Sequence, residues 1–317
     1  MKFKDIKYLE KHDILNQVFL IFLSFLAIIF HSKVNYWYAI PVVNLVFAVI
    51  IFKIVSAFEQ KQFEEKYKHT FLKFLRFWYP VFMISFTFKE IYYLMIGITG
   101  NLIDVKLITI DRNIFGLNPT QFLSGFANPV LTEFLQIIYT LFYLMPLIFS
   151  LELFLWHRYE EFKYNAFIIF LGFYISFIGY LLFPAIGPRF TLHNFESINS
   201  ELPGIFLADW LRDIVNFGES IPKNSLTPDV FAQRDAFPSG HTILIVLVVF
   251  MSRKFKSNSF YFYLPYSILM LFSTIYLRYH YVIDIIAGLV FAVVVIIIAQ
   301  VLYRKDSEKL YPKNNSP

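Results

Sequence analysis

The stretch Tyr281–Tyr303, YVIDIIAGLVFAVVVIIIAQVLY, decides the fold. It is strongly apolar, and its one charged residue, Asp284, lies near its start. A helix needs roughly 20 mostly apolar residues to cross a bilayer. This stretch therefore predicts a transmembrane helix.

Seven further apolar stretches have the length and composition of membrane spans. They are residues 14–31, 36–57, 74–98, 129–155, 164–184, 238–252 and 260–279. Over the whole chain 57% of residues are hydrophobic and only 16% are charged, whereas soluble domains carry about 25% charged residues. No small-residue cleavage site follows the first stretch, so we interpret it as a retained helix and not a signal peptide. The sequence predicts an all-α, polytopic transmembrane helical bundle with about eight spans.

The placement of the basic residues predicts the orientation of the spans. Most of the 28 Lys and Arg residues lie at one set of span ends, which includes both termini. Because Lys and Arg collect in cytoplasmic loops, we expect both termini in the cytoplasm, and an even number of spans agrees. The same distribution argues against nucleic-acid binding. The chain has no cysteine, which excludes disulfides and cysteine-based zinc sites.

Two long loops, 99–128 and 185–237, fall on the opposite side of the membrane. Apolar residues between Ile205 and Phe217 recur near the helical period, so we expect an amphipathic helix there. It could anchor the loop at the membrane interface or act as a lid over a substrate. The predicted organisation is a two-helix extension (1–70), a catalytic membrane domain (71–305) and a disordered cytoplasmic tail (306–317).

Three polar clusters lie at helix ends on that same side. They are Pro184–Arg189, Pro238–His241, and Arg278–Tyr281 with Asp284. The orientation was derived from the Lys and Arg residues at the span ends, so the location of all three clusters on one side is a separate observation. We therefore expect one active site on the extracytoplasmic face.

The third cluster has the residues of a nucleophile with its orienting partner. His280 and Asp284 are spaced i, i+4, so one helical face can present both. A carboxylate that accepts the proton of one imidazole nitrogen leaves the other nitrogen free to attack phosphorus. His241, at a predicted helix start, could protonate the leaving oxygen as a general acid.

The remaining polar residues suit a phosphate. Ser239 and Gly240 can offer N–H and hydroxyl donors at a helix N-terminus, and Arg189 and Arg278 can hold phosphate oxygens. Each motif alone could be a helix cap, a helix stop or an ordinary hydrogen-bonded pair. A zinc or non-haem iron site made by His241, His280 and Asp284 is a further alternative. It explains neither the arginines nor the Ser-Gly helix start, so no metal or other cofactor is expected.

These residues resemble the type 2 phosphatidic acid phosphatase superfamily. Its pattern is Lys-x6-Arg-Pro, Pro-Ser-Gly-His and Ser-Arg-x5-His-x3-Asp. Pro238–His241 matches the second segment completely, and His280 and Asp284 match the end of the third. The resemblance implies a metal-independent enzyme with a six-helix core. It also implies that His280 becomes phosphohistidine, Asp284 orients it and His241 is the general acid.

The other segments depart from that pattern. Leu182 stands at the lysine position and Thr274 at the arginine position of the third segment. The runs Arg278–Tyr281 and Ile110–Gly116 resemble the inositolphosphorylceramide-synthase-like branch. The resemblance implies a lipid phosphatase or phosphotransferase whose substrate is a lipid phosphate or a phospholipid. A hydroxyl acceptor such as inositol or a lipid would be a partner. The alternative is a catalytically inactive lipid-binding or transport protein on the same scaffold.

Overall fold

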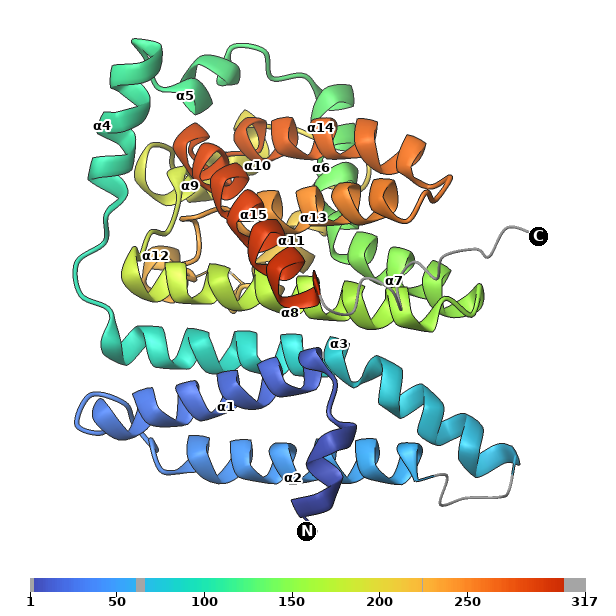
Figure 1. Ribbon diagram of the computed structural model, residues 1–317. Coiled ribbons are helices and arrows are strands. Elements are labelled where there is room, and N and C mark those ends of the chain that lie inside the picture. The colour runs from blue at the N-terminus through green and yellow to red at the C-terminus, as the bar shows by residue number, and fades with distance from the viewer. Residues whose placement is uncertain (1–2, 61–65, 224, 305–317) are drawn as a thin grey trace. The chain divides into compact units, whose positions relative to one another are not determined.

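The computed structural model describes residues 3–60, 66–223 and 225–304, and these are helical with no strand among them (Figure 1). This confirms the all-α prediction; the predicted tail 306–317 lies outside the described residues. The helices are η1 (Phe3–Tyr8), α1 (Lys11–Ile29), α2 (Ala39–Glu59), α3 (Lys66–Ile98), α4 (Asp104–Phe115), α5 (Pro119–Ser124), α6 (Pro129–Leu141), η2 (Phe142–Leu144), α7 (Met145–Leu155), α8 (Tyr159–Leu182), α9 (Pro188–Thr191), η3 (Phe195–Ser197), α10 (Ile198–Glu201), α11 (Ala208–Gly218), α12 (Pro228–Phe231), α13 (Gly240–Lys254), α14 (Phe260–Tyr276) and α15 (Val282–Tyr303).

Within the described ranges, six helical stretches are long and apolar enough to cross a membrane. They are Lys11–Ile29, Ala39–Glu59, Thr70–Ile98, Pro129–Leu155, Tyr159–Leu182 and Val282–Tyr303. The other two predicted spans, 238–252 and 260–279, form α13 and α14, which have 15 and 17 residues. The chain is therefore an integral membrane protein built as a polytopic helical bundle.

The chain divides into two compact units. The first comprises residues 1–98, 152–174 and 298–317, and the second comprises 99–151 and 175–297. The division of the chain at residue 70 remains a prediction. All the predicted site residues belong to the second unit.

The first unit contains a buried ionic cluster between α1 and α3. Arg76 donates to both carboxylate oxygens of Asp13, at 2.9 and 2.8 Å, and the Tyr79 hydroxyl donates to Asp13 at 2.5 Å. Arg76 is 2% exposed and Asp13 is fully buried. A buried charge persists only where a partner and hydrogen bonds offset its lost hydration, so this cluster fixes α1 against α3.

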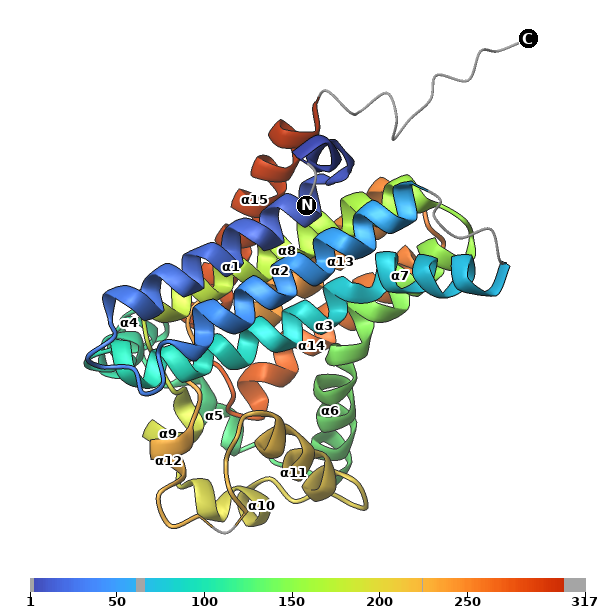
Figure 2. The same cartoon turned by 90° about the horizontal axis from the view of Figure 1, so that it is seen from below.

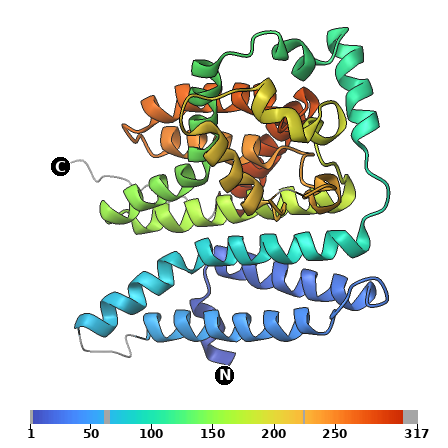
Figure 3. The ribbon, with the colours of Figure 1, turned by 180° about the vertical axis from the view of Figure 1, so that it is seen from behind.

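The second unit gathers short helices at one end of its longer ones. The 185–237 segment contains, in sequence order, α9, η3, α10, α11 and α12, which lie at the end of α6 and α14 (Figure 2). Figure 3, seen from behind, has these helices in yellow to light orange facing the reader. α11 confirms the helix predicted between Ile205 and Phe217, and it packs against α6.

A carboxylate of α6 holds the start of α11. Glu133 accepts the backbone N–H groups of four consecutive residues, 205–208, at 2.6 to 3.3 Å. The first N–H groups of a helix have no partner within the helix. Glu133 satisfies those of Leu207 and Ala208, and it also binds the two residues just before them. α11 buries Leu211 and Val215 and exposes Trp210 and Phe217.

The Asp13–Arg76 pair gives a test of the first unit. We expect Arg76→Met to lower the free energy of unfolding by about 3–5 kcal/mol, because it leaves a buried carboxylate without its partner. The double variant Asp13→Leu/Arg76→Met should recover much of that loss. Thermal unfolding in detergent measures both. Arg158→Met, which breaks the more exposed pair with Glu161, is the matched control and should cost at most about 1 kcal/mol. Equal losses for the two single variants would contradict the assignment.

Candidate active site

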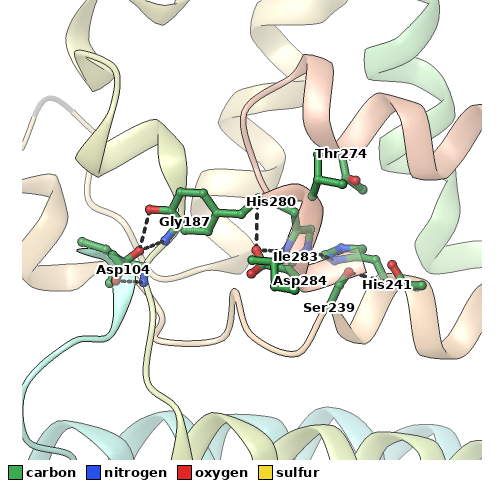
Figure 4. A network of polar contacts seen from close by, with 12 residues as sticks. Asp104, Gly187, Ser239, His241, Thr274, His280, Ile283 and Asp284 are labelled. Carbon is green, nitrogen blue, oxygen red and sulfur yellow. Dashed lines mark hydrogen bonds and ion pairs between the residues drawn. The ribbon is translucent and has the colours of Figure 1, made fainter. Parts of the chain in front are cut away.

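Two histidines that are distant in the sequence face each other in the second unit. His241 lies in the first turn of α13, where the Ser239 hydroxyl caps the helix by accepting the Thr242 N–H at 3.2 Å. His280 lies in the turn between α14 and α15. The His241 Nδ1 is 3.0 Å from the His280 Nε2, a hydrogen-bond distance (Figure 4).

The carboxylate of Asp284 contacts the other ring nitrogen of His280, Nδ1. Its Oδ2 is 3.3 Å from the His280 Nδ1 and accepts the Tyr281 N–H at 2.8 Å. An ionised Asp284 can only accept, and in that state the hydrogen of this contact is on the His280 Nδ1. The lone pair of His280 is then on Nε2, the nitrogen that faces His241.

Burial sets the charge state of His280. The side chain is almost fully enclosed, and this burial lowers the pKa of His280 to about 4. The ring is therefore neutral near pH 7, which is the form that has a nucleophilic lone pair. His241 lies among aromatic rings, with centroid distances of 5.1 Å to Tyr139 and 4.8 Å to Phe142.

The turn before α15 positions His280. The Thr274 carbonyl accepts the N–H groups of both Tyr279 and His280, at 2.9 and 3.1 Å. Arg278 has φ 69°, in the left-handed region that non-glycine residues rarely enter. This reversal places His280 directly before the first turn of α15.

Ser239 and Gly240, both predicted to bind phosphate, also join the helices. The Ser239 N–H donates to the Asp284 carbonyl at 3.1 Å, which ties the start of α13 to the first turn of α15. The Ser239 hydroxyl oxygen accepts the Thr242 N–H with one of its lone pairs. The hydroxyl hydrogen can therefore still be donated. Gly240 lies against the Tyr180 hydroxyl, and a Cβ at this position would overlap that oxygen.

The two predicted phosphate-binding arginines are held by glutamates of the 185–237 segment. Arg189 pairs with Glu219, and its Cζ is 4.8 Å from the centroid of the Tyr279 ring. Arg278 is 1% exposed and donates to Glu201 and to the Ser124 hydroxyl. The structure thus brings together His241, His280, Asp284, Ser239 and Gly240, while each arginine already has an anionic partner.

Two aspartates of α4 organise the site, and the sequence analysis did not select them. Asp104 accepts the Gly187 N–H and the Tyr281 hydroxyl, both at 2.9 Å, and the Ile186 N–H at 3.1 Å. It therefore links the Pro184–Arg189 cluster to the residue that follows His280. Burial raises the pKa of Asp104, although the bonds from Gly187 and Ile186 oppose the shift.

Asp111 holds the start of α15. Its two oxygens accept the N–H groups of Val282 and Ile283 at 2.8 and 2.9 Å. Burial raises the pKa of Asp111, and these two bonds oppose that shift. Asp104 and Asp111 are seven residues apart, so they share one helical face. This spacing was the signal in the sequence that could have identified them.

A small apolar core lies between these polar contacts. Leu107, from the same face of α4, packs with Ala185, Ala236 and Tyr281. The Ala236 N–H donates to the Ala185 carbonyl at 3.0 Å. Gly187, at φ 90°, lets this segment approach the Tyr279 carbonyl, which would lie 2.7 Å from a Cβ. All three sequence clusters thus meet at one place.

Over the described parts of the chain, no three His, Asp or Glu side chains gather as a metal-ligand group. The arrangement offers a neutral imidazole, His280, with a carboxylate behind it and a second imidazole at its Nε2. These groups can carry out nucleophilic attack with proton transfer to a leaving group.

The contact between Gly240 and Tyr180 gives a test of the helix packing. We expect Gly240→Ala to lower the free energy of unfolding by about 1–3 kcal/mol, the usual cost of overpacking. Adding Tyr180→Phe should restore much of it, because the ring carbon Cζ lies 3.5 Å from the new Cβ. Thermal unfolding in detergent measures the cycle. Gly125→Ala, where the nearest atom is 3.5 Å away, is the control. If Tyr180→Phe does not restore stability, the contact with the Tyr180 hydroxyl is not the cause of the loss in Gly240→Ala.

The bonds of Asp111 give a second test. In Asp111→Asn an amide NH2 replaces one acceptor of an α15 N–H group. We expect the amides of Val282 and Ile283 to exchange with solvent roughly tenfold to a hundredfold faster, as the loss of a charge-assisted hydrogen bond implies. Hydrogen–deuterium exchange read by mass spectrometry reports this. Asp229→Asn, at an exposed position, should leave the exchange at 282–283 unchanged. If the amides of Val282 and Ile283 exchange at the wild-type rate in Asp111→Asn, Asp111 does not position the start of α15.

Comparison with known families agrees with this geometry. The family model described as the PAP2 superfamily matches residues 105–298, which is more than half of the chain. The match begins in α4, ends in α15 and includes the three polar clusters. No significant match is found among curated proteins or among solved structures. A chain with this histidine pair, these helices and this match belongs to the PAP2 superfamily of phosphatases.

Proposed function

We propose that this protein is a metal-independent enzyme that removes a phosphoryl group from a lipid phosphate, or transfers a phospho-headgroup from a phospholipid, through a phosphohistidine at His280. The observation that carries the proposal is the chain of contacts from His241 through His280 to Asp284. Within this chain, the 3.0 Å contact places the Nε2 lone pair of His280 beside His241, the proposed proton donor. A bilayer-embedded bundle suits a lipid substrate.

The first half-reaction uses both histidines. The His280 Nε2 attacks phosphorus, the bond from phosphorus to the leaving oxygen breaks, and His241 gives that oxygen a proton. Asp284 stabilises the positive charge that develops on His280. Without substrate, His241 occupies the space in front of Nε2, so the phosphoryl group must enter between the two rings.

The second half-reaction reverses these roles. Water or an acceptor hydroxyl attacks the phosphohistidine, the N–P bond breaks, and the proton of the attacking group passes to His241. Water as the acceptor gives a phosphatase, and a hydroxyl of inositol or of a lipid gives a transferase. The 185–237 segment, which places α11 at this end of the unit, supports transfer because it could exclude water.

The phosphate oxygens would be held by Arg189, Arg278, Ser239 and Gly240. The glutamates that hold the two arginines support this assignment, since a site that binds a carboxylate also suits a phosphate oxygen. Glu219 and Glu201 would then give way to the substrate.

The orientation and the branch also belong to the proposal. The basic residues support cytoplasmic termini and an active site on the extracytoplasmic side. The runs Arg278–Tyr281 and Ile110–Gly116 support the inositolphosphorylceramide-synthase-like branch.

His280→Ala and His241→Ala test the proposal. We expect each to reduce turnover of a phosphatidic acid in detergent micelles by at least about a thousandfold, because the nucleophile or the proton donor is lost. His193→Ala, which removes a histidine hydrogen-bonded to Thr120, is the matched control and should keep the wild-type rate. Release of labelled phosphate measures turnover, and size-exclusion chromatography checks the fold.

Full turnover by both variants would refute the histidine mechanism. Lipid binding without turnover in the wild-type protein would favour the inactive lipid-binding alternative. With a labelled phospholipid donor and inositol or diacylglycerol supplied, a labelled transfer product supports transfer. If free phosphate is the only labelled product, the enzyme is a phosphatase and not a transferase.

A further inference from the structure

Glutamates of one segment bind both arginines of the proposed phosphate site. Glu219, directly after α11, pairs with Arg189, and Glu201, the last residue of α10, pairs with Arg278. The side chains of these arginines are only 6% and 1% exposed. A carboxylate presents anionic oxygens to a guanidinium as a phosphate does. Each glutamate therefore occupies a place that the proposed function gives to a phosphate oxygen.

The two glutamates are carried by one structural body. Arg212 of α11 donates to the Asn199 side chain of α10 at 2.8 Å, and this bond ties the two helices together. Glu201 and Glu219 lie near the two ends of the joined helices. We call residues 198–219 the strap.

The arginines belong to the part of the site that other contacts hold in place. Arg189 is in α9, which begins directly after Gly187, and the Gly187 N–H donates to Asp104 at 2.9 Å. Arg278 is in the turn before α15 and also donates to the Ser124 hydroxyl of α5 at 3.0 Å. The two ion pairs therefore join the strap to the segments that form the catalytic site.

The strap has a further attachment that does not involve the arginines. Glu133 of α6 accepts the N–H groups of residues 205–208, and α11 buries Leu211 and Val215. A cavity of about 970 Å³, whose wall includes Arg189, borders α11 and leaves room for a displaced carboxylate. Loss of the two ion pairs would thus free both ends of the strap while its middle stays on α6.

Arg278 also has a donor that Glu201 does not use. The Arg278 Nε is fully enclosed and has no hydrogen-bond partner among the residues that the structure describes. A buried donor without a partner costs free energy. A phosphoryl group has three acceptor oxygens, so it can bind this Nε as well as the nitrogen that Glu201 holds. This difference favours the exchange of the carboxylate for a phosphate.

We propose that the strap is self-inhibitory: Glu201 and Glu219 occupy the phosphate positions at rest, and the phosphate of the substrate displaces them. The inference rests on the proposed function, which it deepens by naming how the same site is regulated. When phosphate binds Arg189 and Arg278, the strap loses both ion pairs. The apparent affinity for phosphate is then the affinity of the open site reduced by the fraction of protein that is open. The returning carboxylates also help to expel the phosphate product.

Oxyanion binding tests the strap without relying on turnover. The probe is tungstate, a tetrahedral oxyanion, titrated into the full chain in detergent and followed by calorimetry. We expect Glu201→Gln/Glu219→Gln to bind tungstate roughly tenfold more tightly than the wild-type protein, because the competing charges are gone. Glu219→Gln alone should give most of this gain, since the side chain of Glu219 is 14% exposed and that of Glu201 is 41% exposed.

Thermal unfolding separates the strap from a general effect of charge. The double variant should unfold at a lower temperature without tungstate and be stabilised more by its addition, because the ion pairs stabilise only the resting form. Glu196→Gln is the matched control, since it removes the same charge from the same segment at an exposed position. It should change neither the unfolding temperature nor the affinity. Equal tungstate affinity in the wild-type protein and both variants would overturn the proposal, and so would an equal gain in the two variants.

A distance measurement tests the release of the strap. The chain has no cysteine, so spin labels can be attached at Phe217→Cys on the strap and Asn113→Cys on α4, both at exposed positions. We expect tungstate to broaden the distribution of label distances measured by double electron–electron resonance. With Glu201→Gln/Glu219→Gln added, the distribution should be broad before tungstate is present. A distribution that tungstate leaves unchanged would overturn the proposal.

The strap and the proposed function fail in different ways. If His280→Ala keeps full turnover while tungstate still releases the strap, the proposed function is refuted and the strap stands. If His280→Ala abolishes turnover while tungstate binds equally to the wild-type protein and to both glutamine variants, the strap alone is refuted.

Discussion

Two buried aspartates of α4 accept backbone N–H groups from the segments that carry the candidate catalytic residues. The first N–H groups of α15 have no partner within the helix, and burying one unpaired costs about 1–3 kcal/mol. Asp111 satisfies two of them. Asp104 does the same for Ile186 and Gly187 and also accepts the Tyr281 hydroxyl. The position of His280 therefore depends on a helix that contributes no candidate catalytic residue. α4 fixes the end of α15 from which His280 and Asp284 approach His241.

The same constraint operates in the first unit, where the partners are side chains. Asp13 is fully buried and would be unstable there without Arg76 and Tyr79. In both units the buried carboxylates of Asp13, Asp104 and Asp111 have donors around them, which offsets the cost of their burial. The consequences differ. In the first unit the carboxylate joins two helices. In the second, the carboxylates hold backbone segments, and these segments carry the polar clusters.

Much of this fold follows from the sequence, because apolar length alone predicts a membrane helix. The predicted spans 36–57 and 281–303 became Ala39–Glu59 and Val282–Tyr303. The meeting of His241 with His280 was also predictable, because the topology put both on one side. The partners of the arginines were not. Glu201 and Glu219 lie in an irregular segment whose long-range contacts follow no period. Asp104 and Asp111 were missed for another reason: they bind backbone N–H groups, which every residue but proline has, so no partner residue type marks them.

The close fit between the two segments that carry His241 and His280 has a steric basis on α15. Asp284 and Gly288 are four residues apart and so lie on one helical face. Asp284 presents its carboxylate to His280 and its carbonyl to the Ser239 N–H. One turn further, a Cβ on Gly288 would come within 2.7 Å of the Thr242 Cβ and 2.9 Å of the Ser239 carbonyl oxygen. The absence of that Cβ lets α13 approach α15 closely enough for the Ser239–Asp284 bond. Because His241 is two residues from Ser239, and His280 is held by Asp284, this approach also sets the spacing of the histidine pair. The chemistry at the two rings therefore depends on a glycine that touches neither of them.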